Sequence, residues 1–334
     1  MTMTLEPSQS RSRRRASPAA GSATTSPSRQ LQRNFAAVRV SFTWLGVRKN
    51  LNTQQKAQAA ESFGAEGSFL SAGKKLLDTR DPAFQAVSSV RSQIVSYWKA
   101  LSLPYPEPGM RLIKQEDIEK FNQKLNQFRD ELALAVTNLD AHFESLKSAA
   151  QERLGSLFNP ADYPPTLIGM FAVEWDFPSV EPPEYLLRLN PELYEQERQR
   201  MSARFDEAVK LAEETFIAEF SKLVGHLSDR LTVGEDGQKK VFRDSAITNL
   251  SEFFARFKNL NVRSNAELDK LVETAQQVMA GADANAVRDS DTLRQRITSQ
   301  LAAVRSGLDQ MLVEQPRRRI LRSVSPDQAG EVAS

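Results

Sequence analysis

The feature that most constrains this chain is a run of apolar residues whose spacing alternates between three and four over about six helical turns. The run comprises Ile118, Phe121, Leu125, Phe128, Leu132, Ala135 and Leu139. Because an α-helix turns once every ~3.6 residues, this spacing keeps the apolar side chains in one stripe. Such a stripe is typical of coiled coils and helical bundles, and it favours a helical rod over a pocketed enzyme fold.

A second long helix and a proline-rich segment complete the predicted middle of the chain. The first helix is expected from about residue 115 to residue 158, roughly 65 Å at ~1.5 Å per residue if it is continuous. The second is expected over residues 191–231, because Asn190 is a good N-cap and an apolar stripe follows it. Seven prolines in residues 159–191 rule out one continuous helix. We predict that residues 111–233 form a long antiparallel helical hairpin, with the proline-rich segment 159–191 as the turn at its end. Packing the two apolar stripes against each other would hide both from water.

One strand is clearly predicted near the start of the folded part. In residues 38–44, apolar side chains alternate with Arg39, Ser41 and Thr43, a period of two that is typical of a half-buried strand. A strand needs a neighbour that pairs its backbone groups, and the best candidate is the apolar, aromatic stretch 166–177. The chain is therefore predicted to contain a small β-ribbon.

Shorter helices are predicted on both sides of the hairpin. The Asp81-Pro82 dipeptide is typical of an N-cap with proline at the first helical position, and Ser264 with Glu267 fits a capping box. Residues 34–110 are expected to hold the strand plus helices, and residues 234–314 the C-terminal helices. The predicted fold class is mainly α: an elongated helical hairpin or bundle with coiled-coil-like long helices, a small β-ribbon and disordered termini.

Both ends of the chain are basic and poor in apolar residues. Residues 1–33 carry six arginines, one glutamate and two large aliphatic side chains, too little apolar surface to offset the entropy of ordering. Residues 315–334 carry four arginines and two carboxylates. We expect both segments to be disordered tails. The arginines that could contact nucleic-acid phosphates are Arg13, Arg14, Arg15, Arg317, Arg318 and Arg319; the alternative is that these basic ends have no specific role.

The residues that usually carry catalysis are sparse. The chain has no cysteine and two histidines, His142 and His226, neither of which has a second histidine three or four residues away. Residues 71–75 (SAGKK) lack the upstream glycine and the following hydroxyl of a phosphate-binding loop, so a basic turn is predicted there. We therefore expect a protein that is not an enzyme and that holds no cofactor and no metal.

Localisation follows from the same composition. A chain without cysteine needs no oxidising compartment. The N-terminus lacks the apolar stretch of a secretory signal, and no segment approaches the ~18 apolar residues of a membrane span. The predicted protein is cytoplasmic and has no membrane partner.

Three stretches of the sequence resemble a family of uncharacterised bacterial and phage-associated proteins. They are residues 40–51 (VSFTWLGVRKNL), residues 68–77 (SFLSAGKKLL) with Asp78 and Asp81-Pro82 after them, and residues 249–266 (NLSEFFARFKNLNVRSNA). The resemblance covers roughly residues 36–280 and implies no established activity or catalytic residue. Genes of that family often lie near those of a MoxR-type ring ATPase and a von Willebrand factor A-like protein. The resemblance therefore implies an adaptor or substrate of such a system.

These features predict a non-catalytic helical interaction or adaptor protein, with a MoxR-type ATPase system as a candidate setting. A protein partner or a second copy of the chain is expected to bind it. The residues predicted to form its packing or interaction stripe are Leu125, Phe128, Leu132, Leu139 and Phe143. The alternative is a nucleic-acid-associated phage or mobile-element protein that grips its target with the arginine-rich ends.

Overall fold

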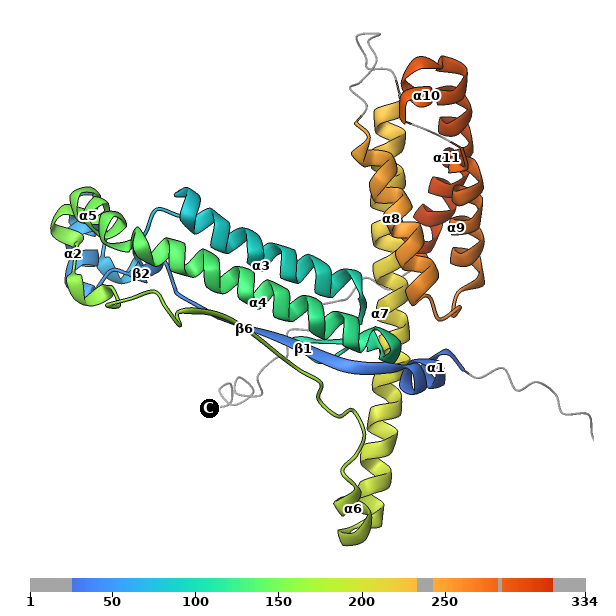
Figure 1. Cartoon of the computed structure of the whole chain (residues 1–334), viewed down its shortest axis with the longest axis horizontal. Coiled ribbons are helices and arrows are strands. Elements are labelled where there is room, and N and C mark those ends of the chain that lie inside the picture. Colours follow the sequence, from blue (N-terminus) through green and yellow to red (C-terminus); the bar gives the residue numbers. More distant parts are fainter. Residues whose placement is uncertain (1–25, 233–242, 282–283, 315–334) are drawn as a thin grey trace, which may run out of the picture.

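The computed structural model describes residues 26–232, 243–281 and 284–314 (Figure 1). This part of the chain is mainly helical and contains a small antiparallel sheet, as predicted. Figure 1 shows two arms that cross. We call residues 35–176, which hold the four-stranded sheet and helices α3 to α5, the sheet arm. Residues 184–314, which hold helices α6 to α11, form the bundle arm.

The sheet has the strand order β4-β5-β1-β6, and all of its pairings are antiparallel. Its strands are β1 (Phe35–Trp44), β4 (Ser102–Pro104), β5 (Met110–Lys114) and β6 (Phe171–Asp176). The predicted strand and its predicted partner are both confirmed, because Val40 of β1 lies opposite Trp175 and Trp44 lies opposite Phe171. The β4–β5 hairpin was not predicted. Pro106, Pro108 and Gly109 lie in the turn of this hairpin, between Pro104 of β4 and Met110 of β5.

Both faces of the sheet are covered where the two arms cross. Leu112 and Ile113 are neighbours in β5 and point to opposite faces, yet both are 0% exposed. Leu112 belongs to the hydrophobic core of the bundle arm, and Ile113 to the core of the sheet arm. The same arrangement buries Ala37 and Val38 of β1 together. The sheet therefore joins two separate hydrophobic cores.

The core of the sheet arm is built by two helices that lie side by side on the sheet. They are α3 (Pro82–Ala100) and α4 (Ile118–Ala141) (Figure 1). The predicted start of α3 is confirmed, because the Asp81 carboxylate accepts hydrogen bonds from the backbone N–H groups of Ala83 and Phe84. The ring of Tyr97 stacks on that of Phe121 with centroids 5.9 Å apart. The apolar stripe of α4 is therefore buried against α3 and the sheet.

The first long helix is shorter than predicted. It ends at Ala141, and a separate helix, α5 (Phe143–Leu154), follows. His142 separates the two helices with φ −98° and ψ 0°, and its Nδ1 atom lies 2.7 Å from the carbonyl oxygen of Asn138. The continuous helix expected over residues 115–158 is therefore wrong, and the break falls where the three–four spacing of the stripe is interrupted.

The predicted antiparallel hairpin is not confirmed. The second long helix begins as predicted at Asn190, whose side chain accepts the N–H of Leu193, and forms α7 (Pro191–Leu231). However, its apolar stripe lies in the core of the bundle arm and packs against other helices, while the stripe of α4 lies in the other core. The reason is that strand β6, within the proline-rich segment, pairs with β1 and packs against α4, so the sheet and α3 cover the stripe of α4 in place of α7.

The bundle arm surrounds the upper part of α7 with the predicted C-terminal helices. They are α8 (Ser245–Leu260), α9 (Ala266–Met279), α10 (Ala284–Asp289) and α11 (Asp291–Glu314). Phe220 of α7 stacks on Phe253 of α8 at 5.0 Å between ring centroids. The N-cap of α9 is Asn265, which accepts the N–H of Leu268 at 3.0 Å, and not Ser264 as predicted. Residues 233–242, between α7 and α8, lie outside the described residues.

The end of the predicted N-terminal tail is folded. Residues 27–34 form helix α1 (Pro27–Asn34), which packs on α7, and the side chain of Leu31 is 0% exposed. The expectation of disorder through residue 33 is therefore wrong for this stretch, because one leucine followed by Phe35 is enough to dock a two-turn helix on an existing core. Residues 1–25 and 315–334 lie outside the described residues, and the six candidate arginines lie within them.

Candidate functional site

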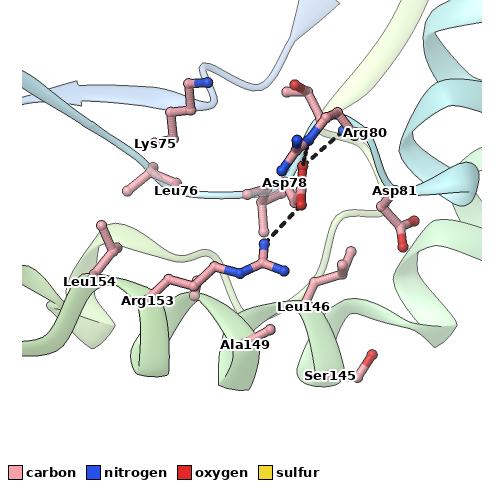
Figure 2. A pocket seen from close by; sticks show the side chains of 13 residues that line it. Lys75, Leu76, Asp78, Arg80, Asp81, Ser145, Leu146, Ala149, Arg153 and Leu154 are labelled. Atoms are coloured by element: carbon pink, nitrogen blue, oxygen red, sulfur yellow. Dashed lines mark hydrogen bonds and ion pairs between the residues drawn. The ribbon is translucent and has the colours of Figure 1, made fainter.

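A cavity of about 880 Å³ lies in the sheet arm between residues 75–81 and α5 (Figure 2). Its lining includes the apolar residues Leu77, Leu146 and Leu154. Two guanidinium groups also line it, Arg80 from the loop and Arg153 from α5, whereas Figure 2 shows the Lys75 side chain pointing away from α5. The cavity therefore combines apolar and cationic binding contacts.

Asp78 holds the two walls of this cavity together. Its carboxylate accepts hydrogen bonds from Arg80 Nε at 3.3 Å, from the Arg80 N–H at 3.0 Å and from Arg153 Nη1 at 2.8 Å (Figure 2). The hydrogen bonds from Arg80, and then that from Arg153, lower the pKa of Asp78 to about 2. The carboxylate is therefore ionised near neutral pH and poorly suited to proton transfer there.

Two other polar groups of the cavity are engaged in local structure. The Ser145 hydroxyl donates to the carbonyl oxygen of His142 at 2.7 Å, and Asp81 caps α3. Across the described ranges, no group of three or more His, Asp or Glu side chains is placed to hold a metal ion. The arrangement offers contacts for binding an anionic or apolar group.

A two-stranded ribbon of unusual charge lies next to the cavity. It is formed by β2 (Arg48–Asn50) and β3 (Gly73–Lys75), which corrects the basic turn predicted at residues 71–75. The register places Arg48 opposite Lys75 and Lys49 opposite Lys74. Like charges directly opposite each other on a ribbon are destabilising. Both pairs therefore need a nearby anion.

Asp162 supplies that anion for one of the two pairs. Its carboxylate lies 2.6 Å from the Nζ atoms of both Lys49 and Lys74, and the pKa of Asp162 is lowered by the hydrogen bonds from Lys49 and then from Lys74. Lys74 Nζ also donates to the carbonyl oxygen of Leu157 at 2.6 Å. Arg48 and Lys75, in contrast, have no carboxylate partner among the described residues.

A second surface is found at the free end of α7. Helix α6 (Glu184–Leu189) packs back on the first turns of α7, and Figure 1 shows this pair extending away from both cores. The first buried side chain of α7 is that of Phe205, and Arg204 before it pairs with Glu107 of the sheet arm, so residues 191–203 project from the body. We call residues 181–203 the tip. Its exposed apolar side chains are Tyr185 (55% exposed), Leu187 (49%), Leu189 (77%) and Leu193 (39%).

The predicted stripe residues lie inside the sheet arm. Their exposed fractions are 0% for Leu125, 5% for Phe128, 2% for Leu132, 0% for Leu139 and 2% for Phe143. A partner could reach them only if that core opened, so they act in packing. The six arginines proposed for nucleic-acid contact lie in residues that the structure does not describe.

The sequence alone does not predict the tip as a surface. Residues 185–189 (YLLRL) fall in the proline-rich segment, for which only a hairpin turn is predicted. The signal that could have found them is an apolar cluster directly before a helix whose own first turns carry mostly charged residues. Phe63 and Phe69, which are 82% and 88% exposed beside the ribbon, were also missed.

Comparisons with protein-family models, with curated proteins and with solved structures find no match. The resemblance to the family encoded near MoxR-type ATPases therefore stays a prediction. Within the described ranges, no helix is both long and apolar enough to cross a lipid bilayer.

Proposed function

We propose that this protein is a non-catalytic helical interaction protein that binds another protein through its tip. The observation that carries the proposal is the exposure of Tyr185, Leu187 and Leu189 at the end of a projecting helix pair. Tyr185 and Leu189 are four residues apart on α6 and so share one face of it, and an exposed apolar face at a projecting position is typical of protein interaction sites. The cavity supports the non-catalytic part of the proposal, because its two carboxylates, Asp78 and Asp81, are engaged in ion pairing and in helix capping.

The chemistry of the tip favours a basic and apolar partner surface. Glu181, Glu184 and Glu192 are exposed there and have no ion-pair partner in the described chain, whereas Arg188 is the one cation among residues 181–192. Electrostatic complementarity selects partners and speeds their encounter. A MoxR-type ring ATPase, the partner class that the resemblance implies, is the first candidate to test against the tip, and we propose the cytoplasm as the setting.

A photo-crosslinking amino acid at Leu189, introduced in the native host, tests the proposal. We expect a defined adduct with a protein that mass spectrometry identifies. The same adduct should be lost when Glu184→Lys and Glu192→Lys reverse the charge of the tip. The matched control carries the crosslinker at Glu252, an exposed position on α8. An absence of adducts at Leu189, or the same adducts at both positions, would contradict the proposal.

The second candidate function is contact with nucleic acid through the arginine-rich ends. It rests on the charge of residues 1–25 and 315–334, which neutralise phosphates without sequence selectivity. Deleting both segments while keeping α1 should abolish retention of the protein on DNA at low salt. Retention that survives the deletion, or none in the full chain, rules this function out.

A further inference from the structure

We infer that the tip of one copy docks on the cavity and ribbon of a second copy, so that the chain assembles head to tail. This inference rests on the proposed function, because it names a partner for the tip. The acceptor surface comprises the cavity beside α5 and the adjacent β2–β3 ribbon.

The charges of the two surfaces are complementary. On the acceptor, Arg48 and Lys75 face each other across the ribbon without a carboxylate to separate them. The tip offers the carboxylates of Glu184 and Glu192, which likewise have no ion-pair partner in the described chain. Docking would give the Arg48–Lys75 pair the counter-charge that Asp162 gives to the other pair of the ribbon.

The guanidinium groups of the cavity have spare hydrogen-bonding capacity for further carboxylates of the tip. The side chains of Arg80 and Arg153 are 86% and 63% exposed, and both are bound to the single carboxylate of Asp78. A guanidinium carries five N–H donors, so most donors of this pair point to solvent. Figure 2 shows both guanidinium groups at Asp78, where the two walls of the cavity meet.

The apolar parts of the two surfaces also match. The cavity is lined by Leu146 and Leu154, which are partly buried, and the tip presents Leu187 and Leu189. Figure 2 shows Leu146 and Leu154 on α5, on either side of Arg153. Apolar contact inside a ring of charge pairs is the usual anatomy of a protein interface.

The two surfaces cannot meet within one copy. Figure 1 places the tip at the free end of α7 and the ribbon with α5 at the far end of the sheet arm. A contact between different surfaces of two copies is heterologous, and it gives either a closed ring or an open chain of molecules. We therefore expect an assembly of copies that depends on protein concentration and that is held together by one kind of junction.

Complementary charge reversal tests this junction. The tip variant carries Glu184→Lys and Glu192→Lys, and the ribbon variant carries Arg48→Glu and Lys75→Glu. None of these four side chains has an ion-pair partner in the described chain, so the fold of each copy should survive. Sedimentation velocity at low salt should show that the wild-type chain assembles, that each variant alone is monomeric, and that an equal mixture of the two variants assembles again.

The controls separate this junction from general charge effects. Glu252→Lys with Glu273→Lys changes the net charge as much as the tip variant, at exposed positions on α8 and α9, and should leave assembly unchanged. Raising the salt should weaken assembly, because the Debye length falls from ~10 Å at 0.1 M to ~3 Å at 1 M.

Three results would overturn the inference. A wild-type chain that is monomeric up to its solubility limit, a single variant that still assembles, or a mixture that stays monomeric each contradicts it. If the wild-type chain is monomeric while the crosslinker at Leu189 still traps another protein, the head-to-tail junction is wrong and the proposed function stands. If neither result is obtained, both are wrong.

Discussion

At the scale of single residues, the contact with the largest consequence is that between Lys74 and Asp162. Removing an ammonium group from water costs several kcal/mol unless a counter-charge and hydrogen bonds replace the lost solvent. The side chain of Lys74 is 6% exposed and that of Asp162 3% exposed. Their contact, with the Tyr163 hydroxyl donating to the carbonyl oxygen of Leu76 at 2.9 Å, fastens the segment after α5 to the ribbon. The acceptor surface described above depends on this attachment.

Asp162→Asn should lower the free energy of unfolding by about 3–5 kcal/mol, because it leaves the buried Lys74 ammonium without a counter-charge. Urea denaturation measures the loss. The control is Asp176→Asn, which breaks an ion pair with Arg39 whose two side chains are each 51% exposed, and such exposed pairs contribute at most about 1 kcal/mol. Equal losses in the two variants would show that Lys74 is not buried.

The lowered pKa of Asp162 also predicts how the free energy of unfolding depends on pH. Hydrogen bonds from Lys49 and Lys74 lower the pKa of Asp162 below the ~3.9 of an unfolded chain, so the folded state favours the ionised form. This contribution is complete above about pH 4 and is lost as the pH falls through the lower, folded-state pKa. Unfolding measured between about pH 5 and pH 2 should show a weaker pH dependence in Asp162→Asn than in the wild type. An identical dependence would contradict this assignment.

At the scale of elements, α1 shows how little sequence is needed to add a helix to an existing core. Leu31 and Phe35 are its apolar contacts at the boundary with the sheet, and both belong to the core of the bundle arm. Leu31→Ala should cost about 2–5 kcal/mol, because Leu31 is fully buried. The control is Gln32→Ala, at the exposed position next to Leu31, and it should change the free energy of unfolding by less than about 0.5 kcal/mol. If Leu31→Ala left the free energy of unfolding unchanged, α1 would not be docked on the core.

The separation of the two long helices makes its own prediction. Phe128 of α4 and Phe220 of α7 lie in different cores, so the effects of Phe128→Leu and Phe220→Leu, about 1–2 kcal/mol each, should add. The sum should hold to within about 0.5 kcal/mol in the double variant. A larger coupling energy would indicate the direct contact between stripes that an antiparallel hairpin requires.

The elements also show what the sequence could predict. Strand β1 and the starts of α3 and α7 were predicted correctly, because they depend on local geometry. The signals were the alternation of apolar and polar side chains in β1 and the N-caps at Asp81 and Asn190. The partners of α4 and α7 were not, because an apolar stripe shows that a face is buried but not which element covers it. The tip was missed for a related reason: Leu187 and Leu189 are as apolar as core residues, and only the fold leaves them exposed.

At the scale of the whole molecule, two arms share one sheet. The 41 residues of α7 span about 60 Å at ~1.5 Å per residue, and they pass from the bundle through the crossing point to the tip. The sheet fixes the direction of both arms because Leu112 and Ile113 anchor its two faces in different cores. The tip and the acceptor surface are held apart by this rigid crossing.

Small-angle scattering from residues 26–314 carrying Glu184→Lys and Glu192→Lys, which should remain monomeric, tests this arrangement most directly. A compact globule of that length would have a radius of gyration of about 19 Å. We predict a clearly larger value and a pair-distance distribution with a long tail from the projecting tip and the sheet arm. A radius near that of the globule, with a symmetric distribution, would contradict the crossed arms and the exposed tip on which the proposed function depends.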